Sequence, residues 1–147
     1  MDTPSTIVSG WMQRQVHIVH PHDTIEHARS ECERHRINQL PVVADGKLAG
    51  IVTDRDLRDA FPSLLEEAEH PGQAHRETNA IHVEDVMTAN VLTIGELEPV
   101  ERAAMIMRRE RVGALPVLRN DHLIGILTRT DLLNALVTIV TAARTKT

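Results

Sequence analysis

The pattern of apolar and polar positions in the first half of the chain predicts a strand, a helix, two further strands and a second helix. Val16 to Val19 is a short apolar run, and the turn residues that follow it deliver Asp23 or Thr24 as a helix cap. Apolar side chains then recur at helical spacing, which predicts an amphipathic helix. The predicted core positions of this helix are Ile25, Ala28 and Cys32.

Two short apolar runs follow this helix and have the features of a β-hairpin. They cover Leu40 to Val43 and Leu48 to Val52, and Asp45-Gly46 between them is a strong signal for a tight turn. An amphipathic segment from about Asp54 to Leu65 predicts the closing helix.

The second half of the chain repeats this pattern. Sliding the sequence by 75 positions superimposes Met12 to Ala60 on the second half without a gap. Asn120-Asp121 takes the place of the hairpin turn, and the closing helix is expected from about Arg129 to Ala143. The matched helix has a broader apolar face, consisting of Val100, Ala103, Ala104, Ile106 and Met107. The boundaries that follow are 1–66 for the first repeat with an N-terminal extension, 67–80 for a polar linker, and 81–147 for the second repeat with its C-terminal helix.

The duplication predicts an α+β fold made of two pseudo-symmetric motifs, each with the order strand, helix, strand, strand, helix. A motif of about 55 residues that exposes an apolar sheet face cannot easily be stable alone. We therefore expect the two motifs to pack face to face through their sheets, with a cleft between them.

Composition narrows the function classes. The 147 residues are 41% apolar and 25% charged, which is typical of a globular domain. Aromatic residues make up 1% and the net charge is -5, so neither base stacking nor general attraction favours a nucleic-acid partner. The single cysteine, the lack of a signal sequence and the absence of a long apolar run predict a cytoplasmic protein that does not enter a membrane.

The most specific chemical feature is a pair of Thr-x-x-Asp motifs, each placed where a strand runs into a helix. Thr53 and Thr128 with the free N–H groups of the helix can bind a phosphate, and Asp56 and Asp131 can accept hydrogen bonds from ribose hydroxyls. The glycine three residues before each threonine would let a ligand approach the strand. The same spacing is also a capping box, which needs no ligand, and the spacing alone leaves both interpretations open.

Catalytic and metal-binding signals are weak. His17, His20 and His22 are clustered, but Pro21 and the lack of a set of Cys or Glu ligands make their spacing unspecific for a metal. Cys32 lies on the apolar helix face without a catalytic partner pattern and is interpreted as a core residue. We therefore predict no catalytic residue, no metal and no enzymatic activity.

The two halves resemble CBS motifs over nearly the whole chain, from about residue 7 to residue 142. The pattern Gly, apolar, x, Thr or Ser, x, x, Asp at the third strand is the nucleotide signature of that family, and both repeats contain it. Further matches are the Met-x-x-x-Val openings and the Arg, apolar, x, x, Leu-Pro-Val segments. These are Met12 to Val16, Met87 to Val91, Arg36 to Val42 and Arg111 to Val117.

The resemblance implies a set of nucleotide-binding residues. Asp56 and Asp131 would hold the ribose, Thr53 and Thr128 the phosphate, and Arg55 or Arg129 would add positive charge. The base would lie against the opening strands and the segments before the Leu-Pro steps, where plain core is the alternative role for the aliphatic residues. The residues implied are Gln15, Val16, His17, Gln39 and Leu40, and Asn90, Val91, Leu92, Ala114 and Leu115.

The resemblance also implies that the two sites are not equivalent. Arg55 and Arg129 occupy different offsets within their motifs. Many members of the family have Thr two residues after the opening Val, whereas the two repeats here have Ile18 and Thr93.

By this resemblance the chain is a regulatory module that needs no cofactor for chemistry and binds an adenosyl ligand. The candidates are AMP, ADP, ATP, S-adenosylmethionine and NAD. A homodimer is expected through the last helix, and a separate effector protein would receive the signal. The expected dimer face consists of Leu132, Leu133, Ala135, Leu136 and Ile139. The alternative is a structural dimerisation adaptor that binds no ligand.

Overall fold

The segment that opens each repeat packs with the other repeat. The computed structural model describes residues 3–61, 68–69, 71–72 and 80–146. One compact unit, here called the central unit, is His17–Val91, and the other, the terminal unit, joins Met1–Val16 to Leu92–Thr147. The N-terminal segment therefore packs with the second repeat, whereas the sequence places it with the first. Most of the predicted linker, 67–80, lies outside the described residues.

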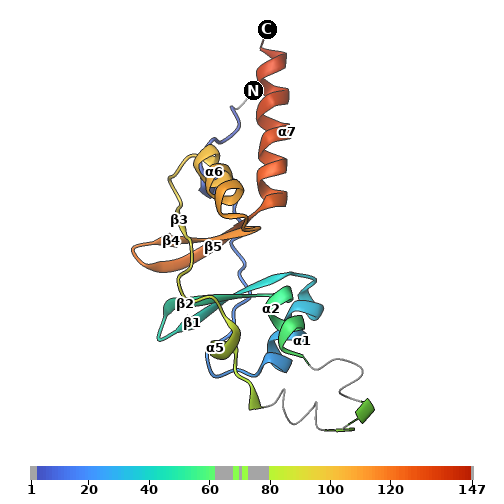
Figure 1. Ribbon diagram of the computed structural model, residues 1–147. Coiled ribbons are helices and arrows are strands. Elements are labelled where there is room, and N and C mark those ends of the chain that lie inside the picture. Colours follow the sequence, from blue (N-terminus) through green and yellow to red (C-terminus); the bar gives the residue numbers. More distant parts are fainter. Residues whose placement is uncertain (1–2, 62–67, 70, 73–79, 147) are drawn as a thin grey trace. The chain divides into compact units, whose positions relative to one another are not determined.

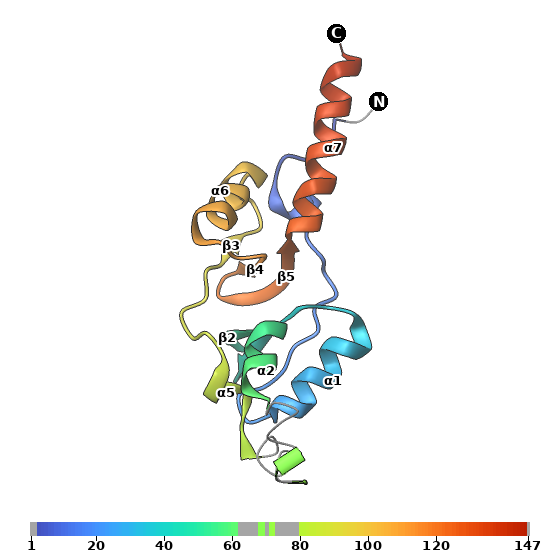
Figure 2. The same ribbon diagram turned by 45° about the vertical axis from the view of Figure 1, so that its right-hand side comes forward.

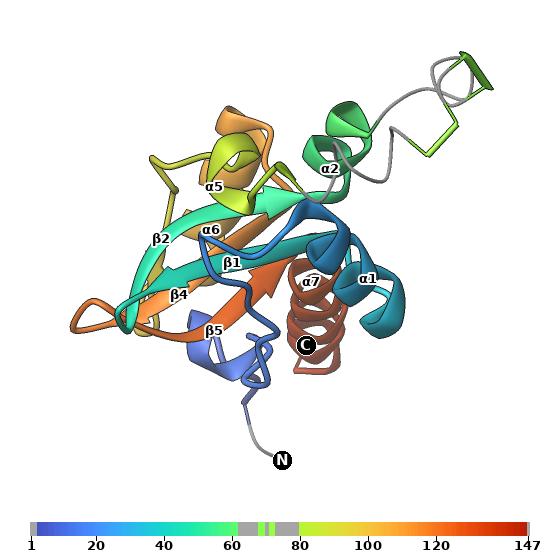
Figure 3. The same ribbon diagram turned by 90° about the horizontal axis from the view of Figure 1, so that it is seen from below.

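The central unit contains one hairpin and its helices. In chain order its elements are α1 (Ile25–His35), β1 (Gln39–Ala44), β2 (Lys47–Thr53), α2 (Asp54–Ala60) and α5 (Val83–Val86). β1 and β2 form an antiparallel two-stranded sheet, with α1 and α2 packed together on one face of it (Figure 1). Figure 3 shows β2 running directly into α2.

The terminal unit repeats this plan with a longer closing helix. They are η1 (Val8–Gly10), β3 (Ile94–Gly95), α6 (Val100–Glu110), β4 (Ala114–Arg119), β5 (His122–Thr128) and α7 (Arg129–Thr145). β3 is parallel to β4, and β4 is antiparallel to β5. α6 and α7 lie on the same face of this sheet (Figure 2). The prediction of an α+β fold built from two repeats is confirmed.

The opening strand of each repeat is shorter than predicted. The run Val16 to Val19 is reduced to one parallel bridge, in which the N–H of Val19 donates to Pro41 and the N–H of Val43 donates to Val19. The pairing stops there because a turn with Pro21 follows, and proline has no N–H to continue a ladder. In the second repeat the equivalent strand, β3, has two residues.

Both hairpins turn in the same way. Asp45 and Gly46 have φ values of 52° and 79°, and Asn120 and Asp121 have 50° and 67°. Positive φ at both central residues is the type I′ geometry that suits the twist of two paired strands. The Asn-Asp turn, a weaker signal in sequence, therefore gives the same hairpin as Asp-Gly.

Each unit has its own hydrophobic core. Ile25, Ala28 and Cys32 are buried in the central core, as the helical spacing predicts. In the terminal unit the broader face predicted for α6 is only partly buried, because Ala103 and Met107 are in the core while Ala104 is exposed. The N-terminal residues Val8 and Met12 complete this core.

The helix boundaries are close to those predicted. Thr24 caps α1, and its side chain accepts a hydrogen bond from the N–H of His27. α2 is described as far as Ala60, and residues 62–65 of its predicted extent lie outside the described residues. In the described part of the chain, no helix combines the length and apolar character needed to cross a membrane.

Candidate functional site

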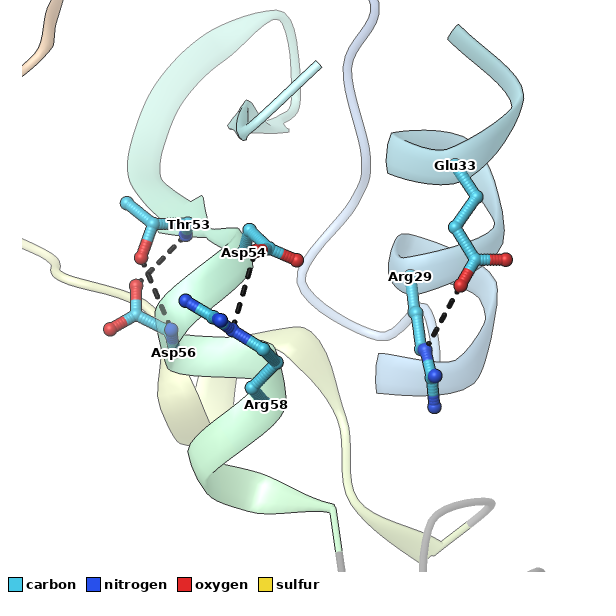
Figure 4. Close-up of polar contacts among 6 residues, drawn as sticks. All are labelled: Arg29, Glu33, Thr53, Asp54, Asp56 and Arg58. Carbon is cyan, nitrogen blue, oxygen red and sulfur yellow. Dashed lines mark hydrogen bonds and ion pairs between the residues drawn. The ribbon is translucent and has the colours of Figure 1, made fainter. Parts of the chain in front are cut away.

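The first Thr-x-x-Asp motif forms a closed capping box at the start of α2 (Figure 4). Thr53 Oγ1 accepts a hydrogen bond of 3.1 Å from the N–H of Asp56, and Asp56 Oδ2 accepts one of 2.9 Å from the N–H of Thr53. These bonds satisfy two donors that the first turn of a helix leaves unpaired. Oδ1 of Asp56 has no hydrogen-bond partner among the residues that the structure describes, so one carboxylate oxygen is available.

The second motif forms the same box at the start of α7 and has one further contact. Asp131 Oδ2 accepts from the N–H of Thr128 at 2.8 Å and from its hydroxyl at 3.0 Å. Oδ1 of Asp131 accepts a 2.7 Å hydrogen bond from Nε2 of Gln13. Asp131 is 3% exposed, whereas Asp56 is partly exposed. Both oxygens of the second carboxylate are therefore occupied within the terminal unit.

The glycine of each motif is covered by the chain itself. A Cβ at Gly50 would lie 2.5 Å from Sδ of Met87 and 2.8 Å from the carbonyl oxygen of Thr88. At Gly125 it would lie 2.7 Å from Sδ of Met12 and 2.9 Å from the carbonyl oxygen of Gln13. The expectation that these glycines admit a ligand is therefore wrong, because the close approach is made by backbone and methionine of the same unit.

The segments before the Leu-Pro steps lie beside the motif threonines. Gln39 pairs with Thr53 across the central hairpin, and Ala114 pairs with Thr128 across the terminal one. The next residues, Leu40 and Leu115, have no exposed surface and belong to the two hydrophobic cores. Their side chains therefore have the core role, and only backbone groups at these positions remain available to a ligand.

The predicted base-binding residues of the opening strands are divided between the two units. Gln15 and Val16 belong to the terminal unit and His17 to the central one. The imidazole of His17 stacks on that of His35, with ring centroids 3.5 Å apart. Asn90 and Val91 belong to the central unit and Leu92 to the terminal one. His17, one of the predicted base-contacting residues, therefore has one face of its ring covered by His35.

Comparison with known proteins identifies the family to which both repeats belong. The family model described as CBS domain matches residues 8–63 and 83–138. The chain belongs to the CBS domain family. A CBS domain-containing protein of Dictyostelium discoideum is 38% identical over 139 residues, which are 91% of this chain and 93% of that protein.

Two solved structures of CBS-pair proteins are similar to this chain and contain ligands. CBSX2, a protein of Arabidopsis thaliana, in complex with AMP has a TM-score of 0.75 at 27% identity, covering 92% of this chain and 99% of that one. The CBS domain pair of protein MJ0100 in complex with 5′-methylthioadenosine and S-adenosyl-L-methionine has a TM-score of 0.74 at 29% identity, covering 90% and 97%.

Other relatives contain CBS motifs within larger enzymes. The chain is 37% identical over 120 residues to an inosine-5′-monophosphate dehydrogenase of Korarchaeum cryptofilum, but spans only 22% of that enzyme. The similarity therefore concerns the CBS pair and not the catalytic part.

The predicted basic residues differ between the two CBS motifs. Arg129 is the first residue of α7, and its guanidinium lies against Gly113, whose Cβ would be 3.6 Å from Cζ. The equivalent first residue of α2 is Asp54, which pairs with Arg58 at 3.3 Å (Figure 4). Arg55 is exposed one residue further on. The start of α7 is thus the more basic of the two helix starts.

Gln13 was missed as a site residue in the sequence. The 75-residue register places Gln13 on Thr88, next to the matched methionines Met12 and Met87. Both residues pair with the edge of the hairpin, Gln13 with Ile126 and Thr88 with Ile51. Most matched positions of the two repeats differ, so the difference between Gln13 and Thr88 does not stand out in the sequence.

The described histidines and the cysteine form no metal site. Within residues 3–61, 68–69, 71–72 and 80–146, no group of three or more His, Cys, Asp or Glu side chains is placed to hold a metal ion. Burial, and then the negative charges of Asp54, Glu31 and Glu33, raise the pKa of Cys32 to about 11. A thiol in this environment stays protonated at neutral pH and is a poor metal ligand or nucleophile.

Proposed function

We propose that this chain is a regulatory module that binds an adenosyl ligand through its Thr-x-x-Asp motifs. The observation that carries the proposal is Oδ1 of Asp56, a carboxylate oxygen one helical turn from Thr53, without a hydrogen-bond partner among the described residues. An acceptor-only group at that place suits the hydroxyls of a ribose. The hydroxyl of Thr53 and the start of α2 suit a phosphate.

The similar CBS pairs that contain AMP, or 5′-methylthioadenosine and S-adenosyl-L-methionine, support an adenosyl ligand for this chain as well. The proposed ligands are AMP, ADP, ATP, S-adenosylmethionine and NAD, and the signal passes to a separate effector protein. A ligand shifts a conformational equilibrium only by its differential affinity for the two states, typically about 1–3 kcal/mol in allosteric coupling.

Calorimetry with this ligand panel tests the proposal. Because Asp56 and Asp131 also cap helices, substitution by alanine would combine loss of a cap with loss of a ribose contact. Asp56→Asn and Asp131→Asn keep a carbonyl oxygen for the cap and replace the other oxygen by a donor. The wild type is expected to bind at least one adenosyl ligand, and the double Asn variant to lose that binding with a smaller fall in melting temperature than alanine at the same positions would cause. A wild type that binds no member of the panel contradicts the proposal.

A dimerisation adaptor without a ligand is the second candidate, and α7 is the observation in its favour. Of the predicted dimer face, Leu132 packs against the core of the terminal unit and Ala135 is buried. The exposed stripe of the same helix, from 39% to 65% exposed, consists of Leu133 and Leu136 of the predicted face together with Val137 and Val140. A contiguous apolar stripe of this kind is typical of an interaction surface.

We propose that a second copy of this chain covers this stripe, in either candidate function. Leu136→Glu is expected to shift sedimentation velocity from dimer to monomer because it places a charge in the stripe. Asn134→Glu, on the exposed flank of the same helix, is the matched control. A monomeric wild type, or a dimer that survives Leu136→Glu, would remove α7 as the interface.

A further inference from the structure

The backbone frame around the two motif carboxylates is the same, and one side chain in it differs. In the terminal unit the N–H of Gln13 donates to Ile126 at 2.8 Å, and the N–H of Ile126 donates back at 3.0 Å. In the central unit Thr88 and Ile51 exchange the same two bonds, at 2.9 and 3.0 Å. Position 13 and position 88 are therefore anchored alike, and only the side chain decides what reaches the aspartate.

From this position the side chain of Gln13 donates a hydrogen bond to Asp131. Its Nε2 lies 2.7 Å from Oδ1 of Asp131, and hydrogen bonds between an amide donor and a carboxylate are among the stronger ones in proteins. The amide thus stands where a ribose hydroxyl would donate. Thr88 makes no equivalent bond to Asp56 among the described residues.

The hydroxyl group of the motif threonine also has an acceptor in the terminal unit and none in the central unit among the described residues. Thr128 Oγ1 lies 3.0 Å from Oδ2 of Asp131 and donates its hydrogen there. Thr53 Oγ1 accepts from the N–H of Asp56, and its own hydrogen has no acceptor among the described residues. The groups that would bind a nucleoside are internally satisfied in the terminal unit and available in the central unit.

We propose that Gln13 decides which motif takes the ribose: its amide closes Asp131, so that a nucleoside binds first at Asp56 and enters the second motif only by displacing Gln13. This inference rests on the proposed function. The side chain of Gln13 is exposed, so it can rotate away without disturbing the anchored backbone. The apparent affinity at Asp131 is the intrinsic affinity multiplied by the fraction of molecules in which the amide has left the carboxylate.

Adenosine is the probe, because it lacks a phosphate and so does not respond to the charge difference between the two helix starts. The second motif is isolated in an Asp56→Asn background and the first in an Asp131→Asn background. In the Asp56→Asn protein, Gln13→Thr is expected to tighten adenosine binding about tenfold, because one competing hydrogen bond to a charged group is lost. In the Asp131→Asn protein, Thr88→Gln is expected to weaken adenosine binding about tenfold.

Each outcome of this titration decides something. Opposite responses, with tighter binding in Gln13→Thr and weaker binding in Thr88→Gln, support Gln13 as a gate to the second motif. Adenosine binding that neither Gln13→Thr nor Thr88→Gln alters overturns the gate and leaves the proposed function standing. Failure of the wild type to bind adenosine overturns the gate, and failure to bind any of AMP, ADP, ATP, S-adenosylmethionine and NAD overturns the proposed function as well.

A second measurement tests the contact without a ligand. The side-chain amide resonances of Gln13 in the wild type are expected to differ from those in Asp131→Ala, because the carboxylate is removed. Saturating adenosine is expected to move the wild-type resonances towards those of the variant. Identical resonances in wild type and Asp131→Ala would mean that the amide does not bind Asp131 in solution, and would overturn the gate whether or not a ligand binds.

Discussion

At the residue scale, each motif aspartate divides its two oxygens between different tasks. Oδ2 of Asp56 and Oδ2 of Asp131 both accept the N–H of the capping threonine, a bond that stabilises the start of the helix. Only Oδ1 is left for a further partner. The capping and ribose-binding interpretations of Thr-x-x-Asp are therefore compatible, because they use different oxygens of one carboxylate.

The local parts of this site were predictable and the occupancy of Oδ1 was not. Thr53 and Asp56 lie three residues apart at a strand-to-helix junction, and their mutual hydrogen bonds follow from that spacing. Gln13 and Asp131 are far apart in sequence, and their contact depends on an antiparallel bridge for which no turn or periodicity gives a local signal. Non-local pairing of this kind appears only in the folded structure.

Cys32 gives a residue-scale prediction for alkaline pH. Burial, followed by the charges of Asp54, Glu31 and Glu33, raises its pKa from the ordinary 9.0 to about 11. A raised folded pKa means that the thiol contributes stability fully below pH 9 and loses this contribution as pH rises through about 11. The loss is on the order of 2–3 kcal/mol, from roughly 1.4 kcal/mol per pKa unit.

The measurement is the urea midpoint from pH 7 to 11 in the wild type and in Cys32→Ala. The chain has no tyrosine, and its lysines are Lys47 and Lys146, so few other groups titrate in this window. The wild type is expected to lose more stability than the variant over the range. Parallel curves for the two proteins would show that the thiol ionises as freely in the folded state as in the unfolded state.

At the element scale, each hairpin depends on a glycine that the chain crosses closely. Met87 and Thr88 lie over Gly50, and Met12 and Gln13 lie over Gly125, with contacts that leave no room for a Cβ. The sequence predicted the strands and turns of both hairpins from short-range patterns. It did not predict these crossings, because the residues that cover each glycine lie outside the hairpin.

Gly125→Ala is expected to destabilise the terminal unit by about 1–3 kcal/mol, the usual cost of forcing an extra methyl group into a packed site. The new Cβ would push against the Gln13 carbonyl and so weaken its bridge to Ile126. Thermal denaturation measures the effect. Gly95→Ala is the control in the same unit, because its Cβ would meet only Cγ of Glu98 at an ordinary 3.6 Å. Equal shifts in melting temperature for the two variants would contradict the crossing as the cause.

At the scale of the whole molecule, the repeat in sequence and the compact unit in space do not coincide. Residues 3–16 precede the first repeat's core but complete the core of the second. Residues 80–91 precede the second repeat's core and complete that of the first. Sliding the sequence on itself reveals the duplication but cannot reveal this exchange, because each opening segment matches its counterpart equally well in either arrangement.

Val8 and Val83 make the exchange testable, because the 75-residue register places one on the other and both are fully buried. Val8 packs in the core with Leu115 and Leu127, and Val83 in the core with Leu40 and Val52. Substitution of either by alanine is expected to cost about 2 kcal/mol, from the lost methyl groups and the cavity left behind.

Amide hydrogen exchange then shows where each loss is felt, since a cooperative unit opens together and reports its own stability. Val8→Ala is expected to speed exchange in β4 and β5, about a hundred residues away in sequence, and Val83→Ala to speed it in the preceding strands β1 and β2. The two variants are matched in residue type and burial, so each serves as the control for the other. If Val8→Ala instead loosened β1 and β2, the N-terminal segment would belong to the repeat that follows it in sequence, and the bond from Gln13 to Asp131 could not form.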